Sequence, residues 1–470
     1  MTSDPSPPLL PAPPLLRREL SLLPLTAVIF FNVSGGPYGI EDAVSTFGPG
    51  LTLLLLLLTP LLWSLPVAVA MAELSSALPE EGGYVSWVKR AFGPFWAFQV
   101  GWWSWVGGFV DVGLYPVLFV DYLSHWLPGI TPAVRWSVAL AFVWSLTLLN
   151  LRGVRLVGWS AVLLGAVAFS PVIGLGILGM GRLGELGSLP LASEGSGLVQ
   201  GLGVGLAVMM WNYSGWDNPT TCLGETRSPE ATYRRALWLS LPLVVLTYAL
   251  TVAVGLGAEP RPERWRSGSL AEIGAAVSGR WLAGWITLAA LLSAAGLFLS
   301  NLLTNSRLPF VLGQDRLLPR SLGWLHPRYA TPWVAIVASS VVYSVLALLP
   351  FTELVVLDVW LYSLALVIEL AAFLAIRLRE PGLPRPWRVP GGVAGALLVV
   401  ALPSLLALLA VATSSWGNTL AGVVAALSGP VAYRAFAREP GGGPPTPSAR
   451  VPAPSGPPPR TGCAGRVPTP

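Results

Sequence analysis

The sequence predicts an all-α integral membrane protein with twelve membrane-spanning helices. Its mean hydropathy is +0.65, and 53% of its 470 residues are hydrophobic while only 11% are charged. A soluble domain carries about 25% charged residues. Apolar runs recur at about the length, roughly 20 residues, that a helix needs to cross a bilayer. Most of the chain is therefore expected to face lipid, and the lipid bilayer is its first expected partner.

Twelve apolar segments meet this length. We expect spans near 22–47, 51–72, 95–120, 134–150, 155–179, 198–218, 236–257, 284–306, 332–349, 352–377, 393–412 and 416–434. Residues 20–438 form the predicted membrane domain. The Pro-rich segment 1–19 and the Pro/Gly-rich segment 439–470 are predicted to be disordered tails. Arg17 and Arg18 precede an apolar run that is typical of a membrane helix and not of a cleavable signal peptide.

Basic residues are distributed unequally between the two sets of connecting segments. With the N-terminus inside, 22 of the 28 Lys and Arg residues lie in inner segments and 6 in outer ones. This positive-inside bias predicts that both termini are cytoplasmic and that the protein resides in the plasma (inner) membrane. Because the basic residues lie in short loops, the net charge of +5 does not indicate a nucleic-acid partner. The longest outer loop, 259–281, is predicted to form an amphipathic helix along the outer surface.

Two of the predicted spans are interrupted by residues that disfavour a regular helix. Span 1 contains Ser34-Gly-Gly-Pro-Tyr-Gly39, and span 6 contains Asn212-Tyr-Ser-Gly-Trp-Asp-Asn-Pro219. The two breaks lie five spans apart. Interrupted helices at corresponding positions of two halves are a sequence indication of a central binding site in a membrane protein. The alternative is a pair of simple Pro/Gly kinks.

Acidic residues lie deep in the apolar spans, without Lys or Arg at comparable depth. They are Glu41, Asp42, Asp111, Asp217 and Glu369. A charge near the bilayer midplane costs on the order of several kcal/mol. Acids kept there without basic partners indicate a cationic substrate, a coupling ion or a proton.

Several stretches of the chain resemble the amino acid–polyamine–organocation superfamily of transporters. They are Val33–Asp42 in span 1, Asp111–Leu123 in span 3, and Glu369–Arg377 followed by Arg385–Pro390 in and after span 10. Within the superfamily the chain is most similar to the polyamine uptake transporters of plants and protozoa. The resemblance implies a LeuT-type fold: two inverted repeats of five helices, about 20–180 and 198–378, and two extra helices at about 393–435. Helices 1 and 6 are then discontinuous.

This resemblance implies a secondary active transporter that imports polyamines or related organic cations by proton symport with alternating access. In amino acid members, N–H groups at the first break hold the substrate carboxylate. Here Glu41 and Asp42 follow that break, where they would repel a carboxylate and attract an ammonium group. Asp217 stands where the superfamily has Asn. The candidate substrate-binding residues are Ser34, Gly35, Gly36, Tyr38, Glu41, Asp42, Asp111, Tyr115, Trp211, Trp216 and Asp217.

Asp111 and Tyr115 have i, i+4 spacing and share one helix face. Tyr38, Trp211 and Trp216 offer rings for cation–π contacts. Glu369, with Asp111, is the candidate for proton handling. Each acid also has a structural alternative, as a helix cap or a hydrogen-bonded group. Glu73, Glu225 and Asp358 lie nearer span ends and are expected to be structural or gating residues.

Two questions stay open at the level of sequence. Span 5 has no Lys, and span 8 offers neutral oxygens that suit a cation, at Ser293, Ser300, Asn301, Thr304 and Asn305. The coupling ion is expected to be a proton, from the resemblance, with sodium as the alternative. The alternative function is an amino acid permease of the same superfamily.

Other classes are disfavoured. Two His residues and two Cys residues, Cys222 and Cys463, provide no catalytic, disulfide or metal-ligand pattern. No cofactor, metal or enzymatic activity is therefore expected. The sequence gives no indication of the oligomeric state.

Overall fold

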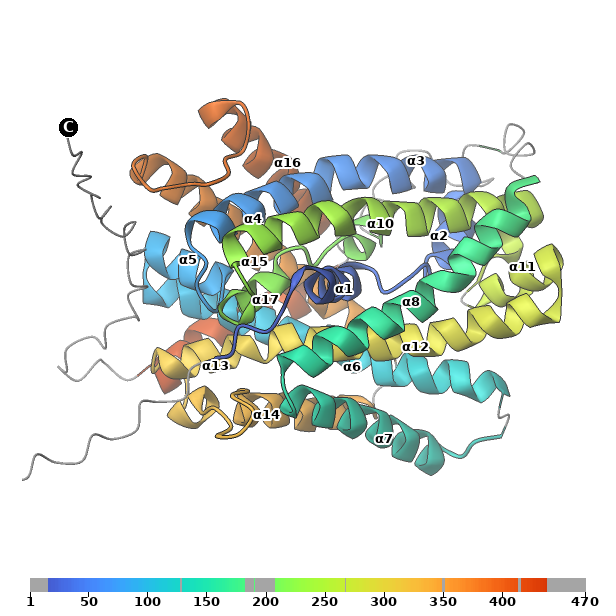
Figure 1. Cartoon of the computed structure of the whole chain (residues 1–470), viewed down its shortest axis with the longest axis horizontal. Coiled ribbons are helices and arrows are strands. Elements are labelled where there is room, and N and C mark those ends of the chain that lie inside the picture. The colour runs from blue at the N-terminus through green and yellow to red at the C-terminus, as the bar shows by residue number, and fades with distance from the viewer. Residues whose placement is uncertain are drawn as a thin grey trace, which may run out of the picture. The chain divides into compact units, whose positions relative to one another are not determined.

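The computed structural model describes residues 16–126, 129–181, 190, 208–266, 268–348, 351–412 and 416–437. Throughout these ranges the regular secondary structure is helical (Figure 1), apart from one isolated bridge between Leu20 and Thr226. The predicted all-α class is confirmed. The predicted tail 439–470 and most of the tail 1–19 lie outside the described residues.

The helices follow the order of the predicted spans. The first half contains α1 (Leu22–Val33), α2 (Glu41–Phe47), α3 (Pro49–Thr59), η1 (Pro60–Ser64), α4 (Leu65–Ala77), α5 (Tyr84–Phe92), α6 (Pro94–Trp126), α7 (Pro132–Leu151) and α8 (Val154–Gly179). The second half contains η3 (Asn218–Glu225), α10 (Pro229–Ala258), η4 (Pro262–Arg264), α11 (Ser269–Ser278), α12 (Arg280–Asn305), α13 (Arg307–Gln314), η5 (Arg320–Gly323), α14 (Trp333–Leu346) and α15 (Phe351–Arg379). The last two helices are α16 (Gly392–Ala412) and α17 (Trp416–Phe436).

Within the described residues, nine helices are long and apolar enough to cross a membrane. Three predicted spans are not among them. The first is divided into α1 and α2, and the sixth lies partly outside the described residues. The ninth is the 14-residue helix α14. These helices indicate a multi-pass membrane protein, while the exact number of twelve spans stays a prediction.

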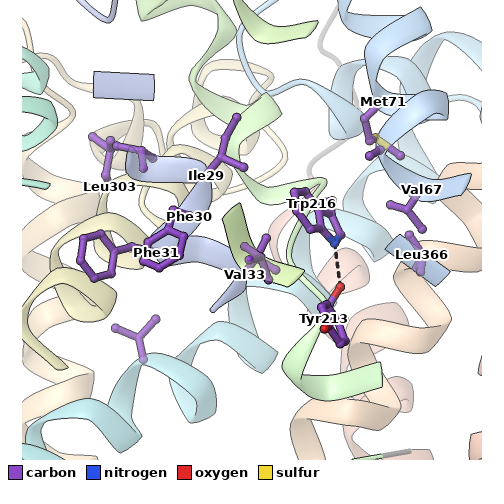
Figure 2. Close-up of a cluster of buried hydrophobic side chains, with 14 of the residues drawn as sticks. Ile29, Phe30, Phe31, Val33, Val67, Met71, Tyr213, Trp216, Leu303 and Leu366 are labelled. Carbon is purple, nitrogen blue, oxygen red and sulfur yellow. Dashed lines mark hydrogen bonds between the residues drawn. The ribbon is translucent and has the colours of Figure 1, made fainter. Parts of the chain in front are cut away.

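Helix α1 lies in the middle of the other helices, where it contacts α8, α10 and α12 (Figure 1). Its sequence is apolar nearly throughout, and nine of its twelve residues are buried. A helix that is apolar on all sides is expected to be surrounded by protein or lipid. The Ile29, Phe30, Phe31 and Val33 side chains pack in a buried cluster with residues of α4, α12 and α15 (Figure 2). This position brings the end of α1 to the centre of the fold.

The break predicted in span 1 is confirmed, since α1 ends at Val33 and α2 begins at Glu41. Gly35, Gly36 and Gly39 have φ angles of 65°, 131° and 91°, a region that favours glycine. A Cβ atom at Gly36 would also lie 2.9 Å from the Tyr38 ring. The glycines therefore allow the chain to turn away from the helix axis in a crowded space.

The break predicted in span 6 is confirmed as well. The helix ends at Asn212 and the 3₁₀ helix η3 begins at Asn218. Gly215 has φ 97°, and a Cβ atom at this position would overlap the carbonyl oxygen of Asn32 at the end of α1. The two breaks thus lie against each other, and a side chain at Gly215 would separate them.

A π-helical segment interrupts span 2, which the sequence analysis did not predict. It covers η1, between Pro60 and Ser64. Proline lacks the N–H group that an α-helix requires, and π-helical turns are frequent at functional sites. Trp63 Nε1 donates to Ser214 Oγ (3.2 Å), and Ser64 Oγ donates to the Tyr213 carbonyl (3.2 Å). The segment therefore connects span 2 to the break of span 6.

A buried ion pair joins the end of η3 to the start of α13. Both side chains of the Arg307–Glu225 pair are at most 1% exposed, with N–O distances of 2.8 and 3.0 Å. The Glu225 carbonyl accepts the N–H groups of Glu19 and Leu20. Glu19, which the prediction assigned to the disordered tail, is therefore paired with the end of η3.

A second buried network lies around Glu73 on α4. Its carboxylate accepts from the Val389 N–H group (2.7 Å), and it pairs with Arg377 and Arg385. Glu73 and Glu225, which we expected to be structural or gating residues, thus each form buried ion pairs between distant segments. The side chain of Asp358 lies outside the described part of the chain.

The segment 259–281, predicted to be an outer loop with a helix, contains the helix α11. Leu270 and Ile273 are buried, and α11 contacts α8, α10 and α12. Its apolar face therefore packs on the helical bundle.

Candidate functional site

A cavity of about 130 Å³ lies at the meeting point of the two helix breaks. Its walls come from both breaks and from η1, α6, α10, α12 and α15. We call it the central cavity. Five of the predicted site residues line it: Ser34, Tyr38, Asp111, Tyr115 and Trp211.

Asp111 supplies the only carboxylate among the described residues that line the central cavity. No Lys, Arg or His residue belongs to this lining. The Tyr115 hydroxyl lies 3.1 Å from each oxygen of Asp111, which fits their i, i+4 spacing on α6. The described residues contain no ion pair that involves Asp111. The described lining of the cavity therefore holds one acidic group and no basic group.

Helix α12 adds neutral oxygen atoms to this wall. Of the five span 8 residues predicted to face a cation, Asn301, Thr304 and Asn305 line the cavity. Asn305 Nδ2 donates to the Tyr343 hydroxyl (2.8 Å), whereas its buried Oδ1 has no partner in the described part of the chain. The Asn305 amide occupies the space that a Cβ atom at position 108 would need. Gly108 lies one helical turn before Asp111 on α6. Asn305 Oδ1 is thus a second acceptor on the same side as Asp111.

The other two predicted oxygens on span 8 do not line the cavity. Ser293 Oγ donates to the Gly35 carbonyl, and Ser300 Oγ is buried without a partner among the described residues. Ser293 therefore fastens the first break to α12.

The backbone N–H groups at the first break are already used. Ser34 N and Gly35 N donate to the Phe30 carbonyl at 2.8 and 3.2 Å, and Gly36 N donates to Ser34 Oγ at 3.2 Å. Gly35 and Gly36 are absent from the cavity lining. These three donors are therefore engaged within the chain, and a substrate carboxylate would have to displace those bonds.

Asp217 lies behind the cavity wall, at 2% exposure. The Tyr362 hydroxyl, which does line the cavity, donates to Asp217 Oδ1 (2.6 Å) and accepts from the Gly215 N–H group (3.0 Å). The predicted residue Asp217 thus reaches the cavity through Tyr362. Its carboxylate has no ion-pair partner among the described residues.

Glu369 lies on α15, two helical turns after Tyr362, and does not line the central cavity. Its side chain is 2% exposed, and neither carboxylate oxygen has a hydrogen-bond partner in the described part of the chain. Asp217 is the charged group that acts on it electrostatically. A buried polar group without partners is uncommon in proteins and requires an explanation.

Trp216 does not line the central cavity, although the sequence analysis expected it to face the substrate. Its indole N–H group donates to the Tyr213 carbonyl (2.8 Å), and its side chain is fully buried. Figure 2 shows it between Val33 of α1 and the Val67 and Met71 side chains of α4. The turn at Gly215 directs Trp216 into the apolar core.

Glu41 and Asp42 also lie outside the lining of the central cavity. Asp42 is exposed. Glu41 is 1% exposed, and its carboxylate accepts the N–H groups of Gly39 (2.7 Å) and Gly268 (3.3 Å). It lines a separate cavity of about 40 Å³ together with Tyr38. We call this space the Glu41 cavity. The first turn of α2 begins at Glu41, so the short break carries both acids away from the centre.

Four aromatic residues of the central cavity were missed, namely Trp63, Tyr84, Trp103 and Tyr248, while Tyr362 also lines it. Trp63 reaches the cavity through the π-helical segment, and its ring centroid lies 6.5 Å from that of Tyr362. Tyr362 had one sequence signal, its seven-residue spacing from Glu369. Within the described residues, no group of three or more His, Cys, Asp and Glu residues has metal-site geometry.

The chain was compared with known proteins. The amino acid permease family model matches residues 20–427. A probable polyamine transporter of Arabidopsis thaliana is 36% identical over 85% of this chain and 80% of the relative. The polyamine transporter RMV1 of the same plant is 37% identical, over 83% and 79%. The polyamine transporter PUT1 of Oryza sativa subsp. japonica is 36% identical, over 86% and 75%.

Proposed function

The chain belongs to the amino acid permease family and is thus a membrane transporter and not an enzyme, and from this premise we propose that it imports polyamines or related organic cations. The observation that carries the proposal is the acid in the central cavity. Asp111 is the one acidic residue in its described lining, which contains no basic residue. An ammonium group there gains charge-assisted hydrogen bonds, which are about twice as strong as neutral ones.

The shape and chemistry of the cavity favour an amine over an amino acid. Asp111 and Asn305 Oδ1 are acceptors on one side, and the Trp63 and Tyr362 rings lie on the walls. An ammonium group over an aromatic face gains about 0.5–2 kcal/mol. An amino acid would need donors for its carboxylate, and the N–H groups of Ser34, Gly35 and Gly36 already have partners. The similarity to proteins named polyamine transporters also supports an amine as the substrate.

We further propose that transport is coupled to protons through Glu369 and Asp217, whereas Asp111, which the sequence also predicted for proton handling, binds the cation. A charged carboxylate buried without a partner costs on the order of several kcal/mol, so Glu369 holds a proton in this conformation. Tyr362 contacts both Asp217 and the cavity. In proton symport, the proton on Glu369 and the cation at Asp111 are held in the same conformation and released on the same side of the membrane. Sodium is the alternative coupling ion.

The proposed transport cycle uses alternating access in a twelve-helix, five-plus-five inverted-repeat fold, with both termini in the cytoplasm and the protein in the plasma membrane. The two breaks five predicted spans apart support the repeat, and the distribution of Lys and Arg supports the orientation. In this orientation the Arg307–Glu225 pair lies on the cytoplasmic side. Opening towards the cytoplasm then requires that this pair separate.

Competition for uptake tests the proposed substrate class. Purified protein is reconstituted in liposomes, and uptake of labelled putrescine is measured with unlabelled spermidine, leucine or alanine outside. We expect spermidine to inhibit and the two amino acids to have no effect. Inhibition by leucine or alanine, without inhibition by polyamines, would support the amino acid permease instead.

A further inference from the structure

The Glu41 cavity has a composition that suits one primary ammonium group. Its carboxylate is 1% exposed and receives two N–H groups, from Gly39 and Gly268. The tyrosines Tyr38 and Tyr122 also line it, and the rest of the lining is mostly apolar. No Lys, Arg or His nitrogen pairs with Glu41 in the part of the chain that the structure describes.

The size of the Glu41 cavity limits what it can hold. A water molecule needs about 10–15 Å³ of such space, and the cavity has about 40 Å³. It therefore accommodates an ammonium group and the end of its methylene chain, and excludes a whole second polyamine. The apolar residues Leu270, Ile286 and Ala290 suit methylene groups.

Tyr38 connects the Glu41 cavity to the central cavity, because it lines both. Its hydroxyl oxygen is buried and has no hydrogen-bond partner among the described residues. The Tyr38 side chain therefore forms part of the wall of both acid-bearing cavities, and its hydroxyl has unused hydrogen-bonding capacity.

We propose that the Glu41 cavity is an outer subsite, where a long polyamine places one ammonium group while another ammonium group binds at Asp111, with Tyr38 between them. This inference rests on the proposed function and adds a determinant of substrate length. A linear polyamine carries several ammonium groups separated by short methylene chains, so it can occupy both cavities. A monoamine occupies only one.

The test compares amines of different length on the full-length protein in liposomes. The inhibitors of labelled putrescine uptake are spermine, spermidine and butylamine, and the variants are Glu41→Gln and Glu272→Gln. Glu272 is an exposed acid on α11, so its variant removes the same charge outside the cavity. Glu41→Gln should weaken inhibition by spermine and spermidine about tenfold, which corresponds to the loss of one charge-assisted hydrogen bond. Inhibition by butylamine should stay within about twofold of the wild type. Glu272→Gln should match the wild type.

A second variant covers the case in which Glu41→Gln fails to fold. Ala290→Leu fills the Glu41 cavity from α12 and keeps the Glu41 carboxylate and its backbone bonds. It should produce the same selective loss for spermine and spermidine. Equal weakening of all three amines, or no change in either variant, would overturn the inference and assign Glu41 a structural role between α2 and α11. If the wild type takes up no putrescine, the proposed function itself fails.

Discussion

The Tyr362 hydroxyl donates a 2.6 Å hydrogen bond to the Asp217 carboxylate and joins helix α15 to the break of span 6. The same oxygen accepts the Gly215 N–H group. One side chain thus satisfies both a backbone group freed by the break and an acid that lies behind the cavity. Because Tyr362 also lines the cavity, a cation bound beside it would be separated from Asp217 by a single hydroxyl group.

Removal of this hydroxyl should impair both stability and coupling. In Tyr362→Phe, Asp217 and Gly215 each lose a partner, which costs about 1–3 kcal/mol for each buried group left unsatisfied. We expect a lower melting temperature and slower putrescine uptake that depends less on external pH. Tyr329→Phe, in the loop before α14, is the matched control. Unchanged pH dependence in Tyr362→Phe would show that Tyr362 is only structural.

Replacement of Glu369 by a neutral residue should abolish the accumulation of putrescine and preserve its exchange. Glutamine has nearly the shape of a protonated glutamate but cannot release a proton. Glu369→Gln should therefore fold and exchange labelled for unlabelled putrescine, and it should fail to concentrate putrescine when the outside is acidified. Counterflow and pH-gradient-driven uptake measure the two activities. Accumulation at the wild-type level would exclude Glu369 as the coupling group.

The Arg307–Glu225 pair should be far more important for stability than the exposed pairs. Removal of one partner leaves a buried charge, at a cost of about 3–5 kcal/mol. Glu225→Gln should thus unfold at a much lower temperature, and the double variant Glu225→Leu with Arg307→Met should recover much of the loss. Lys89→Met, which breaks the partly exposed pair with Asp315, should change stability by about 1 kcal/mol or less. Equal effects of Glu225→Gln and Lys89→Met on the melting temperature would contradict the greater importance of the buried pair for stability.

Glu81, in the loop between α4 and α5, should make stability depend on pH. Its Oε2 accepts the Gly224 N–H group (2.8 Å). Burial and then the Glu225 charge raise the pKa of Glu81 well above its ordinary value. The folded protein therefore binds this proton more tightly than the unfolded chain. Its contribution to stability is complete below the ordinary pKa of Glu, about 4.3, and is lost as the pH rises towards the raised pKa.

Melting temperatures across this pH range test the role of Glu81. Glu81→Gln cannot ionise, so it should lose less stability than the wild type as the pH rises. Glu80→Gln, at the exposed neighbouring position, should follow the wild type. Parallel curves for all three proteins would show that Glu81 does not titrate in this range.

The sequence predicted the helix breaks well because their causes are local. Gly35, Gly36 and Gly215 adopt positive φ angles, and glycine is the residue that permits them. The sequence also predicted that Asp111 and Tyr115 share one helix face, because this follows from helical spacing alone. These local signals were sufficient to place the centre of the fold.

The remaining features depend on contacts between distant segments. Trp216 was expected in the cavity, but the turn at Gly215 directs it to the core, and spacing gives no information on the direction of such a turn. Trp63 lines the cavity from a π-helical segment that was not predicted from the sequence. The Glu73–Arg377 pair joins residues 304 positions apart. Such contacts are set by how the helices pack, so a single sequence does not reveal them.

Uptake of labelled putrescine by Asp111→Asn tests the central claim most directly. Wild type, Asp111→Asn and Asp121→Asn are compared in liposomes with the outside at neutral or acidic pH. Asp121→Asn is the matched control, since it removes a carboxylate from the exposed part of the same helix. The account predicts that acid outside accelerates uptake by the wild type and by Asp121→Asn, and that uptake by Asp111→Asn falls at least about tenfold. Uptake by Asp111→Asn at the wild-type rate would contradict a cation site at Asp111.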